Sequence, residues 1–245
     1  APAANQQPGI DGAAAGQYDT LLGFNVPDLA SQANMTVSDA LALWPTLEAT
    51  GLRLGSPAPA GLNNGWLTDF MDGAEAQNLR VDFLAGHRYG GTNPQTFFDF
   101  VDGLYAQYNL PIWITEFAVR DGNAATPADN RYTDDEVYDF MAAVLPGLEQ
   151  RSYVERYAWF PSGRTNPFVA SSSLFEEDGE RTRVGRLYQG GVDILNAGFE
   201  SPATQDQPGP TDDVPLWETF NVAELSDEHA RTGTHAIRLA PSQAS

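Results

Sequence analysis

The sequence predicts an α/β fold in which a parallel β-sheet is covered by helices on both faces or closed into a barrel. Three observations predict it: short apolar runs recur at a spacing near 30 residues, each run is unbroken, and helix-capping signals lie between the runs. Unbroken apolar strands separated by helices are typical of parallel sheets, because crossover helices bury both faces of such a sheet.

The apolar runs have the composition of buried strands and occupy residues 21–24, 52–56, 81–85, 112–115 and 157–160. The first four begin 31, 29 and 31 positions apart, and the fifth follows 45 positions later. A strand, a crossover helix and two short loops occupy about 30 residues. The spacing therefore indicates repeated βα units.

Local signals mark where three of the helices begin. Thr36 and Thr133 each open a capping box, in which a side chain three residues later bonds back to the first turn. Asn93 followed by Pro94 is a further start signal, and Pro45 predicts a kink in the first helix. The helices expected from these signals span about 36–51, 93–108 and 133–150.

Three regions of different composition divide the chain. Residues 1–17 are rich in Ala, Gly, Gln and Pro and predict an irregular segment. Residues 18–190 carry the βα pattern and are expected to form the core domain. From 191 to 245 a Pro- and Asp-rich linker is followed by alternating residues, which favour part of a β-sandwich.

The charge of the chain limits its partners. The sequence has 33 acidic and 13 basic residues, all of the latter arginine, for a net charge of −20. Such a surface repels nucleic acid and anionic lipid and suits neutral substrates such as polysaccharides, although solubility alone also explains it. Cys is absent, no apolar run reaches about 18 residues, and we expect no metal or organic cofactor.

Polar side chains at the ends of the apolar runs are the candidates for chemistry. The carboxyl ends of parallel strands meet at one edge, so these side chains are expected to gather around one rim. A carboxylate, an amide, an imidazole, a phenol and an indole there would suit a saccharide site. The residues are Glu116, Asn25, His87, Tyr89 and Trp159.

Each candidate also has an ordinary structural explanation. A single Glu after a strand is more often solvated or ion-paired, His87 would serve equally as a hydrogen-bonded rim residue, and Trp159 would serve equally as core packing. Asp28, which follows Pro27, is interpreted as a helix N-cap. The shared placement at strand ends favours the functional interpretation.

These motifs resemble glycoside hydrolase family 128, a family of endo-β-1,3-glucanases. The resemblance rests on residues 21–28, 82–89, 113–118, 159–160 and 173–175 with Gly179, and it covers about 18–190. It implies a (β/α)8 TIM-type barrel and retaining hydrolysis of β-1,3-glucan. It further implies that Glu116 is the nucleophile, that Asn25 holds the sugar 2-hydroxyl, and that His87, Tyr89 and Trp159 line the subsites. We also expect a secreted, extracellular monomer.

The chain departs from the family at Val26, where the family has its acid/base Glu. Loss of a positioned acid/base removes about 10²–10⁴ in rate, so activity is expected to be impaired. Sequence error, deliberate knock-out and natural loss all explain the change. A non-catalytic β-glucan-binding protein and a related barrel hydrolase acting on another β-glycan remain alternatives.

The resemblance also concerns the ends of the chain. By motif order, the strand at Leu21 corresponds to the fourth of eight, so the barrel is expected to lack its first three βα units and the chain to be a fragment. The tail resembles the opening of a galactose-binding-like carbohydrate-binding module, through residues 196–200, Trp217 and 232–236. An accessory strand pair or a linker is the alternative for this tail.

Overall fold

The computed structural model describes residues 19–61, 65–190, 223–226 and 236–239. The chain divides into two units, Ala1–Val192 and Asp193–Ser245, and each is treated by itself. The segment 1–17, expected to be irregular, lies outside the described residues.

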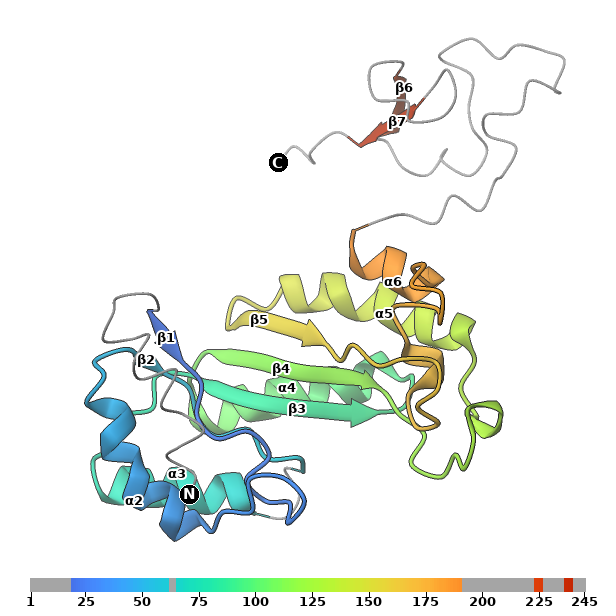
Figure 1. Cartoon of the computed structure of the whole chain (residues 1–245). Helices are drawn as coiled ribbons and strands as arrows, with labels where there is room; N and C mark the ends of the chain where they lie inside the picture. The colour runs from blue at the N-terminus through green and yellow to red at the C-terminus, as the bar shows by residue number, and fades with distance from the viewer. Residues whose placement is uncertain (1–18, 62–64, 191–222, 227–235, 240–245) are drawn as a thin grey trace, which may run out of the picture. The chain divides into compact units, whose positions relative to one another are not determined.

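Five parallel strands follow one another through the first unit (Figure 1). One parallel pair contains the first two strands, and a three-stranded parallel sheet contains the next three. The Ser56 amide donates to the Phe83 carbonyl at 2.9 Å, which joins the end of β2 to the segment before β3. Strand order therefore follows chain order, and the predicted α/β fold with parallel strands is confirmed. The strands are β1 Thr20–Leu21, β2 Arg53–Leu54, β3 Leu84–Gly90, β4 Ile112–Val119 and β5 Val154–Trp159.

Helices connect the successive strands as crossover elements. Each of the first four lies in the chain between two neighbouring strands, and the last follows β5. Two short 3₁₀ helices, Pro127–Asp129 (η2) and Ala170–Ser172 (η3), lie in the loops after β4 and β5. The α-helices are α2 Val37–Glu48, α3 Trp66–Ala76, α4 Pro94–Tyr108, α5 Asp134–Glu149 and α6 Arg183–Tyr188.

The capping signals confirm the three predicted helices. The Thr36 hydroxyl accepts the Asp39 amide at 3.1 Å, and the Thr133 hydroxyl accepts the Glu136 amide at 3.2 Å. The Asn93 side chain accepts two amides of the first turn of α4. Such bonds satisfy amides that the helix itself leaves without partners. Pro45 lies inside α2, which continues through it as one helix to Glu48.

Separate apolar clusters stabilise the two halves of the first unit. One cluster packs α2 and α3 beside β1 and β2, with Trp44 and Phe70 completely buried. The other packs α4 and α5 against β3–β5, with Phe117 completely buried. Burial of one such side chain contributes about 1.5–3 kcal/mol. The clusters hold the strands so that their carboxyl ends face the same edge.

The parallel strands are seen, but the barrel expected to lack its first three βα units and the partial β-sandwich stay predictions. Among the described residues β1 pairs with β2 alone and β5 with β4 alone, so the parallel strands form an open series. In the second unit β6, Ala223–Ser226, pairs antiparallel with β7, Ala236–Leu239. The other residues on which the sandwich prediction rests, 196–200, Trp217 and 232–235, lie outside the described residues.

Candidate active site

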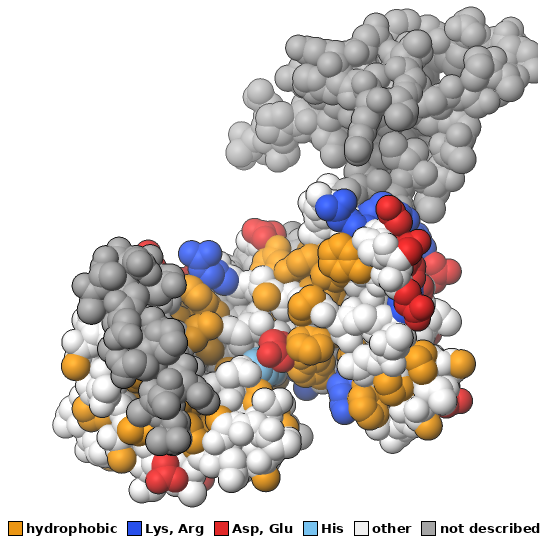
Figure 2. Space-filling view, in the orientation of Figure 1, with side chains coloured by type: hydrophobic (Ala, Val, Ile, Leu, Met, Phe, Trp, Pro, Cys, Tyr) orange, Lys and Arg blue, Asp and Glu red, His pale blue; other side chains and the backbone are white. Residues whose placement is uncertain are grey.

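A cavity of about 790 Å³ opens at the carboxyl ends of the strands. Figure 2 shows this hollow, with a histidine and an acidic side chain near its centre. Five predicted residues line it: Asn25, Val26, His87, Tyr89 and Glu116. Of the five side chains expected around one rim, four line this cavity, and Trp159 is not among its described lining residues. Its other lining residues are Leu29, Gln32, Ala60, Gly61, Arg88, Phe100, Arg120 and Phe160.

Glu116 is held by side chains of the neighbouring strand. It lies within β4 rather than at its end, because β4 continues to Val119. The Tyr89 hydroxyl donates to Glu116 Oε2 at 2.6 Å. His87 Nδ1 lies 3.5 Å from the same oxygen, beyond ordinary hydrogen-bond length. The hydrogen bond from Tyr89 is charge-assisted, and such a bond fixes the direction in which the Glu116 carboxylate points.

A β-bulge turns Glu116 toward the cavity. Gly86 pairs with Ile114 but His87 pairs with Glu116, so Thr115 is an extra residue without a partner in β3. Ile114 and Phe117 both pack in the same apolar cluster although they are three positions apart, which a regular strand would not allow. The bulge therefore lets Phe117 return to the core while Glu116 lines the cavity.

The two titratable neighbours of Glu116 stay neutral near pH 7. Burial lowers the pKa of His87 below 6.5, and the Glu116 charge opposes this shift only in part. Its Nε2 atom is buried with no hydrogen-bond partner among the described residues. Burial, and next the hydrogen bond to Glu116, raise the pKa of Tyr89 above its usual value of 10.0. The phenol therefore keeps its proton and donates a hydrogen bond to the carboxylate.

The opposite wall comes from the segment after β1. Asn25 forms a parallel bridge with Ala58, and the Val26 amide donates to the Ala58 carbonyl at 2.8 Å. Val26 is 6% exposed and has φ of 45°, in the left-handed region. A β-branched residue there is a backbone outlier, and such outliers gather at functional sites.

Asp28 corrects one sequence prediction. It begins no helix, because the next helix, α2, begins at Val37. Its carboxylate instead accepts the amide of Ala60 at 2.8 Å and of Gly61 at 3.3 Å. These two residues line the cavity, so Asp28 holds the loop that forms part of the wall. The short segment 28–36 gave no local signal for such a long-range contact.

Trp159 differs from the prediction that it lines the subsites. It is 3% exposed, and its indole N–H donates to the Ser172 carbonyl at 2.8 Å. Its ring packs edge-on against Phe117, with centroids 5.0 Å apart. Core packing, the alternative explanation, describes Trp159 in this structure. The next residue, Phe160, lines the cavity and lies edge-on to Tyr89.

Two arginines of the cavity gave no sequence signal. Arg88 lies over the Phe100 ring and Arg120 over the Phe168 ring, each at 4.9 Å. Neither has a carboxylate within ion-pairing distance in the described part of the chain, and burial lowers the pKa of Arg88.

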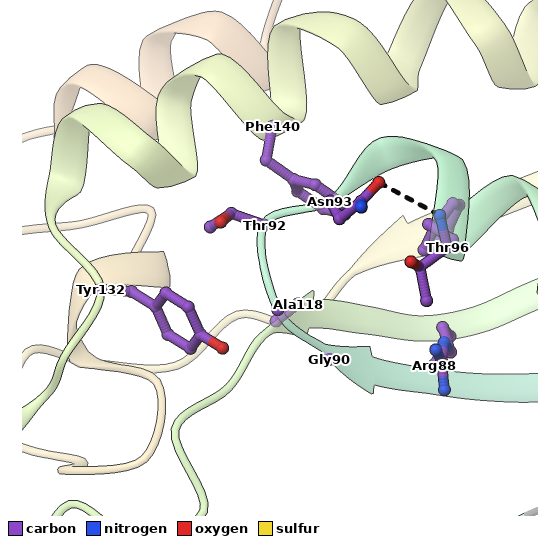
Figure 3. Close-up of a pocket in the computed structure, with 10 residues that line it drawn as sticks. Arg88, Gly90, Thr92, Asn93, Thr96, Ala118, Tyr132 and Phe140 are labelled. Carbon is purple, nitrogen blue, oxygen red and sulfur yellow. Dashed lines mark hydrogen bonds between the residues drawn. The ribbon is translucent and has the colours of Figure 1, made fainter.

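Two other hollows lack this combination of groups. One of about 300 Å³ lies at the start of α4, where Figure 3 shows the Asn93 side chain bonded to the Thr96 amide. None of the described residues that line it is acidic. Another of about 600 Å³ contains Asp134, which is ion-paired with Arg164 at 2.7 Å. The cavity at Glu116 is therefore the candidate active site.

The described residues contain neither a metal-binding cluster nor a membrane-spanning helix. Within the described ranges, no group of three or more His, Asp or Glu side chains is placed to hold a metal ion. None of the helices there has the length and apolar character needed to cross a membrane.

A carboxylate held by a phenol among amide and aromatic groups, at the carboxyl ends of parallel strands, is typical of enzymes that cleave sugars. The sequence matches the family model described as glycosyl hydrolase catalytic core over residues 4–188, and the chain belongs to this family of glycoside hydrolases. The match begins within the N-terminal segment that composition alone assigned as irregular.

Solved structures of glycoside hydrolase family 128 are similar to this chain. A subgroup I endo-β-1,3-glucanase from Amycolatopsis mediterranei is 40% identical with a TM-score of 0.63, covering 73% of this chain and 75% of that chain. A subgroup V exo-β-1,3-glucanase from Cryptococcus neoformans is 27% identical with a TM-score of 0.60, covering 71% and 70%. These neighbours support the suspected family.

A curated relative is known from Schizosaccharomyces pombe. Alkali-sensitive linkage protein 1 is 34% identical over 180 residues, which are 69% of this chain. The chain spans 32% of the length of this curated relative.

Proposed function

We propose that this chain is the core of a retaining β-1,3-glucan hydrolase whose turnover is impaired at Val26. One observation carries the proposal: Glu116, held by Tyr89 at 2.6 Å, lines the same cavity as Asn25 and Val26. This is the arrangement that a two-step displacement at an anomeric carbon needs, with a fixed carboxylate on one side of the sugar.

Each group of the cavity has a role in that reaction. Glu116 attacks the anomeric carbon and forms a covalent glycosyl-enzyme. The Asn25 amide binds the 2-hydroxyl, a contact that strengthens as positive charge develops on the sugar ring. Phe160 and Tyr89 offer apolar surface to the pyranose rings, and the buried His87 sets the volume beside Glu116.

The substrate class comes from the structural neighbours. The Amycolatopsis mediterranei enzyme was crystallised with laminaritriose and laminaribiose, and with laminarihexaose. This chain shares about 40% identity with it over most of the catalytic core. We therefore propose a β-1,3-linked glucan for the cavity at Glu116.

Val26 removes one of the two carboxylates that the reaction requires. An apolar side chain neither protonates the leaving oxygen nor activates water, and the loss of an acid/base costs about 10²–10⁴ in rate. The left-handed backbone at Val26 also strains its β-branched side chain. The straight stem of glutamate relieves part of that strain.

Laminarin hydrolysis by Val26→Glu tests the proposal. We expect reducing ends to appear about 10² times faster, or more, than with the unchanged chain. Val26→Gln is the matched control and should stay inactive, because glutamine has nearly the shape of glutamate but no carboxyl proton to give. Adding Glu116→Gln to Val26→Glu should abolish the gain. No gain from Val26→Glu in a folded protein contradicts the proposal.

A non-catalytic β-glucan-binding protein is the second candidate, and Val26 itself favours it. Such a protein keeps the cavity and its aromatic wall while lacking the acid. It predicts laminarihexaose binding by calorimetry with no turnover, both in the unchanged chain and in Val26→Glu. A hydrolase acting on another β-glycan is tested by a panel of β-1,4- and β-1,6-linked glucans.

We also propose that the protein acts outside the cell as a monomer and that its tail assists binding. A polysaccharide substrate and a net charge of −20 support this view. Retention on insoluble β-1,3-glucan, compared with and without residues 191–245, tests the tail. Equal retention would favour a linker. Light scattering tests the monomer, and detection in the culture fluid tests secretion.

A further inference from the structure

The turn before α2 carries a three-residue pattern that the proposed reaction does not use. Asn34, Met35 and Thr36 place a Thr two positions after an Asn, with a residue other than Pro between them. No other Asn of the sequence is followed two positions later by Ser or Thr. This pattern is the acceptor for N-linked glycans, which secreted proteins carry on surface loops. Because so short a pattern also arises by chance, its structural context decides whether a glycan fits there.

Asn34 lies in an exposed turn whose backbone is held by hydrogen bonds. Its φ is 46°, in the left-handed region that Asn tolerates better than most residues. The amides of Asn34 and Gln32 both donate to the Leu29 carbonyl, at 3.2 and 3.0 Å. Asn34 is exposed, whereas the next residue, Met35, is 5% exposed and packs in the apolar cluster of α2 and α3. The turn therefore presents the acceptor residue to solvent while its neighbour anchors the turn in the core.

The backbone alone does not require this pair of residues. The Thr36 hydroxyl caps α2, because it accepts the Asp39 amide at 3.1 Å and donates to the Asp39 carboxylate at 2.7 Å. Ser serves equally at such a cap, and Gly serves at little cost. Gly also adopts the positive φ of position 34 more readily than Asn. An Asn followed two positions later by Thr provides a glycan acceptor as well, which these replacements at position 34 do not.

We propose that Asn34 is an N-glycosylation site, modified while the chain is exported by a route that has an oligosaccharyltransferase. The donor is an oligosaccharide joined through a diphosphate to a polyprenol lipid. The carboxamide nitrogen of Asn34 attacks the anomeric carbon of the donor, a carbon–nitrogen bond forms, and the bond from that carbon to the diphosphate oxygen breaks. The lipid diphosphate leaves with the electron pair, and one carboxamide proton passes to water. The inference rests on the secretion proposed above and not on the chemistry of Glu116.

A glycan on Asn34 lies at the lip of the candidate active site and outside its cavity. Leu29 and Gln32, in the same turn, line the cavity, whereas Asn34 is not among its described lining residues. Leu29 is 42% exposed, and its carbonyl accepts the Asn34 amide. The first sugar of the glycan therefore covers apolar surface on the rim of the β1–β2 wall and leaves the space for a substrate open.

Secretion of the full chain by a yeast host tests the site. We expect the intact mass of most molecules to exceed that of the bare chain by one oligosaccharide. Peptide-N-glycosidase F should remove this mass and leave aspartate at position 34, which tandem mass spectrometry locates. The midpoint of urea unfolding should be the same before and after removal, because the glycan displaces no packed side chain and Asp also tolerates positive φ. A secreted chain without a glycan on Asn34 overturns the inference, and a midpoint lowered by the glycan contradicts its fit at the lip.

Variants of the two pattern residues separate modification from folding. Asn34→Gly suits the positive φ, and Thr36→Gly keeps most of the cap, so both should lose the glycan and still fold. Thr36→Ser should keep the glycan and the cap. A glycan that persists in Asn34→Gly is attached elsewhere and overturns the inference. Laminarin hydrolysis by Val26→Glu, measured on the chain without its glycan, tests the proposed function independently of these results.

Discussion

The two walls of the cavity differ in the polar groups that they offer to a substrate. On the β3–β4 wall, Glu116 accepts a 2.6 Å bond from Tyr89 and is turned inward by a bulge. On the β1–β2 wall, Val26 offers an apolar side chain on a left-handed backbone. The walls belong to separate apolar clusters. Under the proposed function, one wall would therefore lack its proton donor while the carboxylate of the other wall stays held by its hydrogen bond.

Removing the hydroxyl that orients Glu116 should weaken the β3–β4 wall most. A hydrogen bond to a charged group contributes about 1.5–3 kcal/mol, so Tyr89→Phe should slow glycosyl-enzyme formation by about 10- to 100-fold. The burst of fluoride from β-laminaribiosyl fluoride measures this rate. Tyr132→Phe, outside this cavity, is the control. An unchanged burst rate would show that Tyr89 only packs against the site.

Two neighbouring residues at the end of β5 differ in role: Trp159 packs in the core, and Phe160 lines the cavity. Trp159→Phe should lower the free energy of unfolding by about 2 kcal/mol, because it loses packing and leaves the Ser172 carbonyl without its donor. Glucan affinity should not change. Phe160→Leu should do the reverse, weakening affinity with little effect on stability. Denaturant unfolding measures the free energy of unfolding, and calorimetry measures the glucan affinity. Weaker glucan binding by Trp159→Phe would mean that Trp159 does contribute to a subsite.

The strain on the β1–β2 wall can be measured with two substitutions at one position. Val26→Ala removes the two γ-methyl groups and Val26→Gly removes the whole side chain, and only glycine adopts positive φ without cost. We expect the glycine variant to be the more stable by about 1 kcal/mol in urea unfolding. At Val137, inside α5, the same pair should show the opposite order. Equal stabilities at position 26 would mean that Val26 is not strained.

The smallest of these predicted effects is a pH dependence of stability that comes from His87. Its folded pKa is lowered from 6.5, so the unfolded chain takes up a proton first as the pH falls. Stability present above pH 6.5 is therefore lost below it, by less than about 1 kcal/mol between pH 7 and pH 6. In His87→Gln, the midpoint of urea unfolding should change less with pH between pH 7 and pH 6. A midpoint that rises on acidification would contradict the neutral imidazole.

Local signals in the sequence were enough for the elements they mark. The caps at Thr36, Asn93 and Thr133 predicted three helices because a cap bonds only within its own first turn. Helix α3 gave no such signal, since its N-cap is Gly65 without a side chain. The third strand begins at Leu84 rather than at the predicted Val81 and runs to Gly90, because its extent depends on pairing with β4.

The sequence predicted which strands carry the residues of the candidate site, but it did not predict which face of a strand each residue lies on. Asn25, His87, Tyr89 and Glu116 were found because polar residues that follow apolar runs of parallel strands meet at one edge. Trp159 was placed on the wrong face by the same reasoning. Adjacent residues of a strand point in opposite directions, so the choice between two neighbouring aromatic residues depends on what packs behind the sheet.

The sequence by itself determined the succession of strands and helices and the starts of the capped helices, because these depend on neighbours in the chain. The resemblance of its motifs to a family supplied Glu116 as the nucleophile candidate. Tertiary structure alone decided the inward turn of Glu116 at Thr115, the positive φ of Val26 and the arginines of the cavity. Each of these follows from contacts between segments far apart in the chain, whose energies no local pattern encodes.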